Sequence, residues 1–112
     1  MVDIDRLTSA QLRARRRRLA ARLSDPQVVL AGSLVSQSRR CGKAGCRCAG
    51  GEEHGPYTYL SARVGGVARL RYVPAALLNV VRRRVKQTEV FEALIAEISA
   101  INLELLARRE LD

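Results

Sequence analysis

The amino-acid sequence predicts an α+β fold: a small antiparallel β-meander with one helix before it and two helices after it. Three observations lead to this prediction. Residues 9–23 are arginine-rich with helical periodicity, residues 28–73 contain strand-like segments separated by glycines, and residues 74–110 contain two further helical patterns. With 112 residues, the chain is expected to form a single domain, residues 1–112, around one modest core.

The first helix is marked by a capping pattern at its start. Thr8 is followed three residues later by Gln11, and Asp25-Pro26 provides the stop, so we expect a helix over residues 9–23. Leucines recur on one side of this helix, and arginines occupy the other side. Over residues 9–23, the helix contains no acidic residue that could pair with these arginines. Its four consecutive arginines are suited to a phosphate backbone or to a solvated surface: Arg15, Arg16, Arg17 and Arg18.

The clearest strand signal is a hairpin over residues 57–73 with Gly65-Gly66 at its turn, preceded by a shorter strand within residues 32–39. A two-residue turn places Leu60 opposite Arg71 and Ala62 opposite Arg69 on one side of the sheet. Tyr59 then faces Tyr72, and Ser61 faces Leu70, on the other and more apolar side. Arg69 and Arg71 would project together, either as a basic surface or as a soluble edge.

The C-terminal residues predict a helical pair over residues 74–110. Pro74 is suited to the first position of a helix that ends in the basic run at residues 82–86. The last helix, residues 89–109, carries a heptad-like seam and needs a partner: the arginine-rich first helix of the same chain, whose charge complements its glutamates, or the same helix of a second copy. The seam residues are Phe91, Leu94, Ile98, Ile101 and Leu105.

All three cysteines and the only histidine lie within fourteen residues: Cys41, Cys46, Cys48 and His54. Three thiolates and one imidazole form the ligand set of a closed structural zinc site, and the intervening glycines permit tight turns around a small ion. We therefore expect a structural zinc that clasps the meander of residues 28–73. The cysteine spacing is not the common pair of two-residue knuckles, so buried free thiols, a disulfide or a redox site stay open as alternatives.

The net charge of +9 is concentrated in the first part of the chain. Residues 1–86 contain eighteen Lys and Arg against five Asp and Glu, whereas residues 87–112 contain two against six. This asymmetry favours a polyanionic partner, DNA rather than RNA, and not a membrane, because the aromatic face of a membrane-surface helix is absent. The expected phosphate-binding residues are Arg15, Arg16, Arg17, Arg18, Arg39, Arg40, Lys43, Arg47, Arg69 and Arg71.

The opposing hypothesis is a protein-interaction or dimerisation module that uses residues 89–110. Neither hypothesis requires catalysis: the sequence has no phosphate-binding loop, and no nucleophile with a dedicated base, so we expect a non-enzymatic protein. The first residues contain two aspartates and no apolar run, and no segment approaches the ~20 apolar residues of a membrane span. These features predict a cytoplasmic protein.

The string from Gly32 to Pro74 resembles a family of short, uncharacterised bacterial proteins. The resemblance is carried by Cys-Gly-Lys-x-x-Cys-Arg-Cys-Ala, His-Gly-Pro-Tyr-x-Tyr-Leu, Val-Gly-Gly and Arg-Tyr-Val-Pro, and extends to the Ile-Asn-Leu-Glu-Leu-Leu tail at residues 101–106. The family resemblance implies a genetic context near mobile elements or phages, without an established activity. It marks these motif positions: Cys41, Cys46, Cys48, His54, Pro56, Tyr57 and Tyr59.

Overall fold

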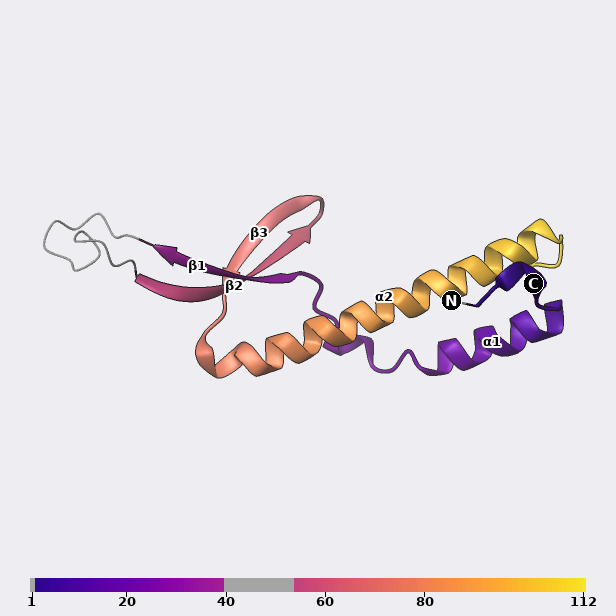
Figure 1. Cartoon of the computed structure of the whole chain (residues 1–112), viewed down its shortest axis with the longest axis horizontal. Coiled ribbons are helices and arrows are strands. Elements are labelled where there is room, and N and C mark those ends of the chain that lie inside the picture. The colour runs from indigo at the N-terminus through magenta and orange to yellow at the C-terminus, as the bar shows by residue number, and fades with distance from the viewer. Residues whose placement is uncertain (1, 40–53) are drawn as a thin grey trace, which may run out of the picture. The chain divides into compact units, whose positions relative to one another are not determined.

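The computed structural model describes residues 2–39 and 54–112 (Figure 1). Within these residues, two α-helices and a three-stranded antiparallel sheet confirm the α+β class. The helices are α1 (Ser9–Ala21) and α2 (Leu78–Ala107); the strands are β1 (Ser33–Arg39), β2 (His54–Val64) and β3 (Val67–Tyr72); and short 3-10 turns cover Ile4–Arg6, Pro26–Val28 and Ala75–Leu77. The chain divides into two compact units, called here unit 1 (Met1–Val28 with Gln87–Asp112) and unit 2 (Val29–Lys86).

The predicted pair of C-terminal helices is wrong, because α2 is one continuous helix of 30 residues. No glycine or proline interrupts the sequence between the basic run at 82–86 and the seam that begins at Phe91. The backbone hydrogen bonds therefore continue through residues 86–89, since a change from basic to acidic side chains does not by itself stop a helix. The two periodic patterns are successive parts of a single helix, and the first belongs to unit 2 while the second belongs to unit 1.

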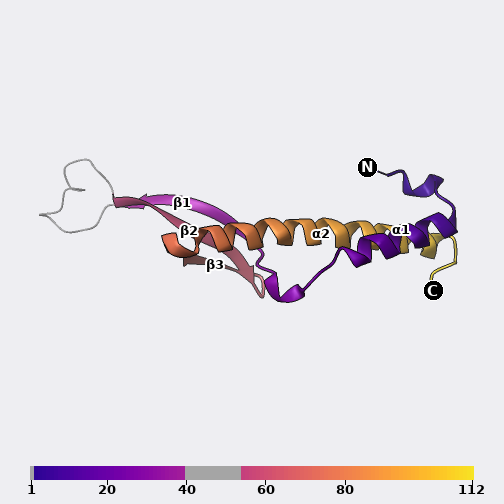
Figure 2. The same ribbon diagram turned by 90° about the horizontal axis from the view of Figure 1, so that it is seen from below.

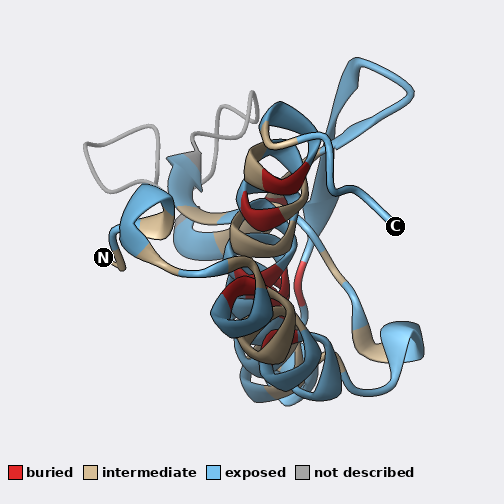
Figure 3. Cartoon of the chain, turned by 90° about the vertical axis from the view of Figure 1, so that its right-hand side faces the viewer, coloured by how far each residue is buried: buried red, intermediate tan, exposed pale blue. Residues whose placement is uncertain are grey.

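Unit 1 is built from α1 and the later part of α2, which run antiparallel (Figure 2). Thr8 and Gln11 form the predicted capping box: the Gln11 backbone N–H donates to Thr8 Oγ1 at 3.1 Å, and the Thr8 N–H donates to Gln11 Oε1 at 2.9 Å. The two helices share one core, and most buried positions of the chain lie along them (Figure 3). The core residues are Leu12, Leu19, Phe91, Leu94, Ile101 and Leu105. The predicted seam is thus used within the chain.

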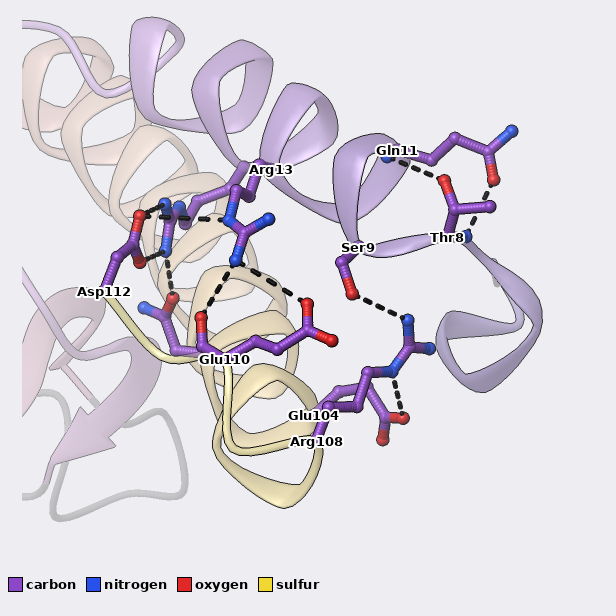
Figure 4. A network of polar contacts seen from close by, with 10 residues as sticks. Thr8, Ser9, Gln11, Arg13, Glu104, Arg108, Glu110 and Asp112 are labelled. Atoms are coloured by element: carbon purple, nitrogen blue, oxygen red, sulfur yellow. Dashed lines mark hydrogen bonds and ion pairs between the residues drawn. The ribbon is translucent and has the colours of Figure 1, made fainter.

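The turn after α2 reverses the direction of the backbone. Arg109 adopts a left-handed conformation with φ 59°, the Arg109 N–H donates to the carbonyl of Leu106, and the Glu110 N–H donates to the carbonyl of Leu105 at 2.8 Å. This pair of bonds is the Schellman arrangement that commonly ends a helix, usually with glycine at the left-handed position. As a result, Glu110 and Asp112 lie beside the arginines of α1 (Figure 4).

Unit 2 contains the sheet, in the strand order β1-β2-β3. The hairpin register predicted from Gly65-Gly66 is confirmed, with Leu60 opposite Arg71 and Tyr59 opposite Tyr72. β1 joins the other edge of β2, with Leu34 opposite Leu60, and its last residue, Arg39, pairs with His54. Both glycines of the turn have positive φ, which the two central positions of such a tight hairpin turn require.

The core of unit 2 lies on the face of the sheet that carries Arg69 and Arg71, not on the face that carries Tyr59 and Tyr72. Leu60 and Val73 are buried with Val85 of α2, and Leu34 packs against the same cluster. The sheet is two-residue periodic, so Leu34, Leu60 and Arg71 must share a face. The helix therefore covers the leucines of β1 and β2, whereas every residue of the edge strand β3 stays exposed, including both arginines.

Candidate nucleic-acid interface

The charge of the molecule is divided unequally between the two units. Unit 1 contains nine Lys and Arg and nine Asp and Glu, so the formal charge of its side chains is zero. Unit 2 contains eleven Lys and Arg against two Asp and Glu, and accounts for the entire net charge of +9. The fold places the acidic residues that follow position 87 in the same unit as the arginines of α1, which neutralises the most basic run of the sequence.

Three arginines of α1 contact acidic residues of unit 1. Arg15 Nε donates to Glu97 Oε1 at 2.7 Å. Arg13 Nη2 donates to the backbone carbonyl of Glu110 at 3.0 Å (Figure 4). Arg16 donates to both carboxylate oxygens of Asp112, at 2.9 and 2.8 Å. Arg15 and Arg16, predicted to bind phosphate, are therefore engaged in holding α1 to α2 and to the turn that follows it.

The ion pair between Arg16 and Asp112 changes the acidity of the carboxyl group. The hydrogen bonds from Arg16 lower the pKa of Asp112 to about 2, with smaller contributions from a backbone hydrogen bond and from the charges of Arg16 and Arg13. The same hydrogen bonds raise the pKa of Arg16. Arg16 Nη1 also donates to Asn102 Oδ1 at 2.8 Å. The guanidinium is thus shared by two acceptors of the same unit, and an external phosphate would have to compete with both.

Arg17 and Arg18 lie on the exposed side of α1, and Arg22 follows the helix in an exposed position. The side chains of these three arginines form no ion pair or hydrogen bond in the described part of the chain. The arginine run is therefore split by the helix: two members stabilise unit 1, and two remain available at its surface.

Unit 2 presents a basic surface on two elements. Its described residues, 29–39 and 54–86, contain eight Lys and Arg and no Asp or Glu. Arg69 and Arg71 are exposed on β3. On α2, Asn79, Arg82, Arg83 and Lys86 line an open depression of about 530 Å³. The spacing of these four residues puts them on one side of the helix, while Leu78, Val81 and Val85 face the core.

The helical cations Arg82, Arg83 and Lys86 were not among the expected phosphate-binding residues. Their position in the last turn of a predicted helix had a structural explanation, namely compensation of the helix dipole. Because α2 continues for 21 residues beyond Lys86, that explanation does not hold. The signal in the sequence that points to them is the lack of any acidic residue from position 54 to position 88.

The other face of the sheet gathers all three tyrosines of the chain. The ring centroids of Tyr59 and Tyr72 are 5.8 Å apart, those of Tyr57 and Tyr72 are 6.2 Å apart, and both pairs meet edge to face. The register places Leu70 and Arg63 on the same face. We call these five residues the tyrosine face. None of them is buried, and Tyr72 is 56% exposed.

The predicted zinc site falls mostly outside the described residues, as do the expected phosphate-binding residues Arg40, Lys43 and Arg47. Cys41, Cys46 and Cys48 belong to residues 40–53, and only the backbone position of His54, at the start of β2, is described. The ladder pairs His54 with Arg39, which brings the two ends of the cysteine-containing segment together. Within residues 2–39 and 54–112, no three His, Cys, Asp or Glu side chains are grouped as metal ligands would be.

These features define a small α+β protein with a charge-balanced helical unit and a basic sheet-containing unit. The chain belongs to the family described as a domain of unknown function, DUF6788, whose model matches residues 9–83. The match includes α1, the sheet and the first residues of α2, so the arginine-rich helix belongs to the family region as well as the sheet. No similar curated protein and no similar solved structure was found.

Membership of this family agrees with the resemblance to a family of uncharacterised proteins that the sequence motifs indicated. The bacterial setting and the proximity to mobile elements stay predictions. None of the described helices combines the length and the apolar character of a membrane-spanning segment.

Proposed function

We propose that the chain binds nucleic acid, DNA in preference to RNA, through the basic surface of unit 2. The observation that carries the proposal is the location of the charge: unit 1 is neutral, and unit 2 holds the whole +9 with no acidic side chain among its described residues. Lys and Arg without acidic neighbours attract phosphate groups. When they bind, the counterions condensed on the nucleic acid are released. The candidate contacts are Arg69, Arg71, Arg82, Arg83 and Lys86, with Arg39, Arg40, Lys43 and Arg47 beside the cysteines.

The assignment differs from the sequence prediction in the part played by α1. Arg15 and Arg16 are paired with carboxylates, so binding phosphate would require those pairs to break. In the proposed interface these two arginines stabilise unit 1, and Arg17 and Arg18 make at most a peripheral contribution. Contacts to phosphates carry no sequence information directly, so weak sequence preference is expected.

The proposal includes a structural zinc ion held by Cys41, Cys46, Cys48 and His54. The pairing of Arg39 with His54 supports it, because it brings His54 close to the start of the segment that contains the thiols. Such an ion would stabilise the end of the sheet at which Arg39 lies, with no open position for catalysis. The proposal also includes a cytoplasmic location and a role near mobile elements or phages. The second of these is implied by the family resemblance.

Binding of a fluorescein-labelled duplex, followed by anisotropy at increasing salt, tests the proposal. The wild-type affinity should fall with a log–log slope of about −0.9 per phosphate contact. Arg69→Gln/Arg71→Gln and Arg82→Gln/Arg83→Gln should each weaken binding and flatten that slope. Arg17→Gln/Arg18→Gln removes the same charge from the surface of unit 1 and should have little effect. A salt-independent affinity, or equal weakening by the α1 variant, would contradict the assignment to unit 2.

A second candidate function is association through α2, and exposed aliphatic side chains favour it. Ile95, Leu103 and Leu106 are 56%, 66% and 55% exposed, on the side of the helix that faces away from the core of unit 1. Exposed apolar positions that recur along one side of a helix are typical of a contact with another helix. The predicted seam residues cannot serve this purpose, because Leu94 and Ile101 are buried against α1.

Sedimentation equilibrium separates the two candidates. If association is the function, Leu103→Ser/Leu106→Ser should abolish a dimer while the monomer stays folded, and the basic variants of unit 2 should still associate. A monomer at all concentrations in the wild type would contradict a homodimer.

A further inference from the structure

We propose that the tyrosine face binds the bases of single-stranded nucleic acid, so that the preferred ligand is a single strand and not a duplex. The inference rests on the proposed function and names the form of nucleic acid that the sheet recognises. Tyr57, Tyr59, Tyr72 and Leu70 would provide contacts to bases, and Arg63 a contact to phosphate.

The packing of unit 2 leaves the tyrosines on an open face of the sheet. Leu34 and Leu60 point to the opposite face, where α2 covers them. A sheet of this size gains its stability from one covered face, so aromatic side chains on the other are not needed for the core. All the tyrosines of the chain lie on this face. Exposed aromatic residues that cluster on one face are more typical of a binding surface than of a face that contacts only solvent.

The geometry of the tyrosine rings also favours stacking of a base. Tyr72, the most exposed of the three, contacts both other rings edge to face, at centroid distances of 5.8 and 6.2 Å. The neighbouring rings hold Tyr72 laterally while more than half of its surface stays accessible. A ring that is held in place loses little conformational entropy when a base stacks on it, and stacking on aromatic side chains tolerates any base because each has a π-face.

The charge on the tyrosine face also favours nucleic acid. Arg63 lies on the same face of β2, four residues from Tyr59 and thus ~13 Å along the strand. No acidic side chain occurs among the described residues of unit 2. A single strand could therefore stack its bases on the tyrosines and pair a phosphate with Arg63 at the same time. In a duplex the base faces are stacked inside the helix, where ring stacking cannot reach them without unstacking. The surface thus favours a single strand.

The tyrosines themselves provide the readout. The chain contains no tryptophan, and its three tyrosines all belong to the proposed site, so tyrosine fluorescence reports on this face alone. The probes are an oligothymidylate of about 12 nucleotides, within the size range of small single-strand sites, and a duplex of the same length. We expect the oligothymidylate to bind more tightly than the duplex and to quench the tyrosine fluorescence.

Two variants separate stacking from general effects. Tyr72→Leu keeps an apolar side chain but removes the ring, and should weaken binding of the single strand about tenfold with little change for the duplex. Tyr72→Phe, the matched control, should bind nearly as the wild type does. Tyr57→Leu provides a second test, and thermal unfolding by circular dichroism checks that each variant is folded.

The failures are distinguishable. If both probes bind with a normal salt dependence, but without quenching and equally well to Tyr72→Leu, the stacking assignment is wrong and phosphate binding stands. If neither probe binds the wild type at low salt, the proposed function itself is overturned. If instead the face mediates self-association that Tyr72→Leu abolishes, the tyrosines are a contact between copies and the assignment is also overturned.

Discussion

Arg16 of α1 and Asp112 lie 96 residues apart in the sequence and form an ion pair through two parallel hydrogen bonds (Figure 4). The left-handed conformation of Arg109 makes the pair possible, because it turns the chain back toward α1 after α2 ends. The pair balances one positive charge of the arginine run, and the pair of Arg15 with Glu97 balances a second. The pair of Arg16 with Asp112 also makes the stability of unit 1 depend on pH.

The first prediction concerns this pH dependence. The folded pKa of Asp112 is lowered to about 2, below the ordinary 3.8, so its contribution to stability is present above pH 4 and is lost as the pH falls toward 2. The wild type should therefore melt at a higher temperature than Asp112→Asn at pH 6. The difference should shrink progressively between about pH 4 and pH 2. The pair is solvent-exposed, so a small difference is expected; a constant difference across that range would contradict the lowered pKa.

The second prediction compares two neighbouring aliphatic residues of α2. Ile101 is fully buried between α1 and α2, whereas Leu103 is 66% exposed. Ile101→Ala should lower the free energy of unfolding by about 2–5 kcal/mol, because it removes buried methylenes and leaves a cavity. Leu103→Ala should change it by about 0.5 kcal/mol or less. Chemical denaturation measures both values, and a large effect at Leu103 in a monomeric sample would argue against the observed packing of α2.

The third prediction is a stabilising change at the end of α2. Arg109 has φ 59°, a conformation that costs side-chain-bearing residues energy but costs glycine none. Arg109→Gly should therefore raise the free energy of unfolding by about 1 kcal/mol while keeping the hydrogen bonds of the turn. Arg18→Gly, within the exposed face of α1, removes the same charge from a right-handed helical position and should destabilise by about 1 kcal/mol. Equal signs for the two variants would contradict the left-handed turn.

The fourth prediction tests the proposed zinc ion. Protein purified without added metal should contain one zinc per chain by elemental mass spectrometry. Cys46→Ser should lose both the metal and thermal stability, since metal binding contributes to folding in small domains. The buried Thr88, in α2, offers a control: Thr88→Val should keep the metal content, whatever its effect on stability. A folded wild-type protein without metal would make the cysteines ordinary thiols.

Local sequence signals predicted several elements correctly. The Thr8 and Gln11 capping box, the register across Gly65-Gly66 and the core positions of the seam were predicted because each depends on residues close together in the chain or on a fixed periodicity. The prediction failed at residues 86–89, where a change in charge pattern was interpreted as a helix boundary. A helix ends where its backbone hydrogen bonds are interrupted or capped, and nothing at those positions does either.

The candidate interface was predictable only in part. Arg69 and Arg71 were expected on one face of the sheet, and they are exposed there. Pairing of the first helix with the glutamates of the last was one of two alternatives that the sequence left open. Which arginines pair, and the openness of the tyrosine face, could not be derived, because each depends on which elements pack together. Arg82, Arg83 and Lys86 were not among the expected contacts for a different reason: the end of their helix was placed too early, so the helix dipole offered a structural explanation for their charge.

The sequence by itself determined the class of fold, the strand register and the total charge of this protein, because these follow from periodicity, turn residues and composition. Only the tertiary structure decided where that charge resides. Packing α1 against the acidic part of α2 neutralises one unit, and leaves the sheet-containing unit with the full +9. Coulomb interactions depend on distance in space and not on separation along the chain, so the basic surface could be located only once the helices were paired.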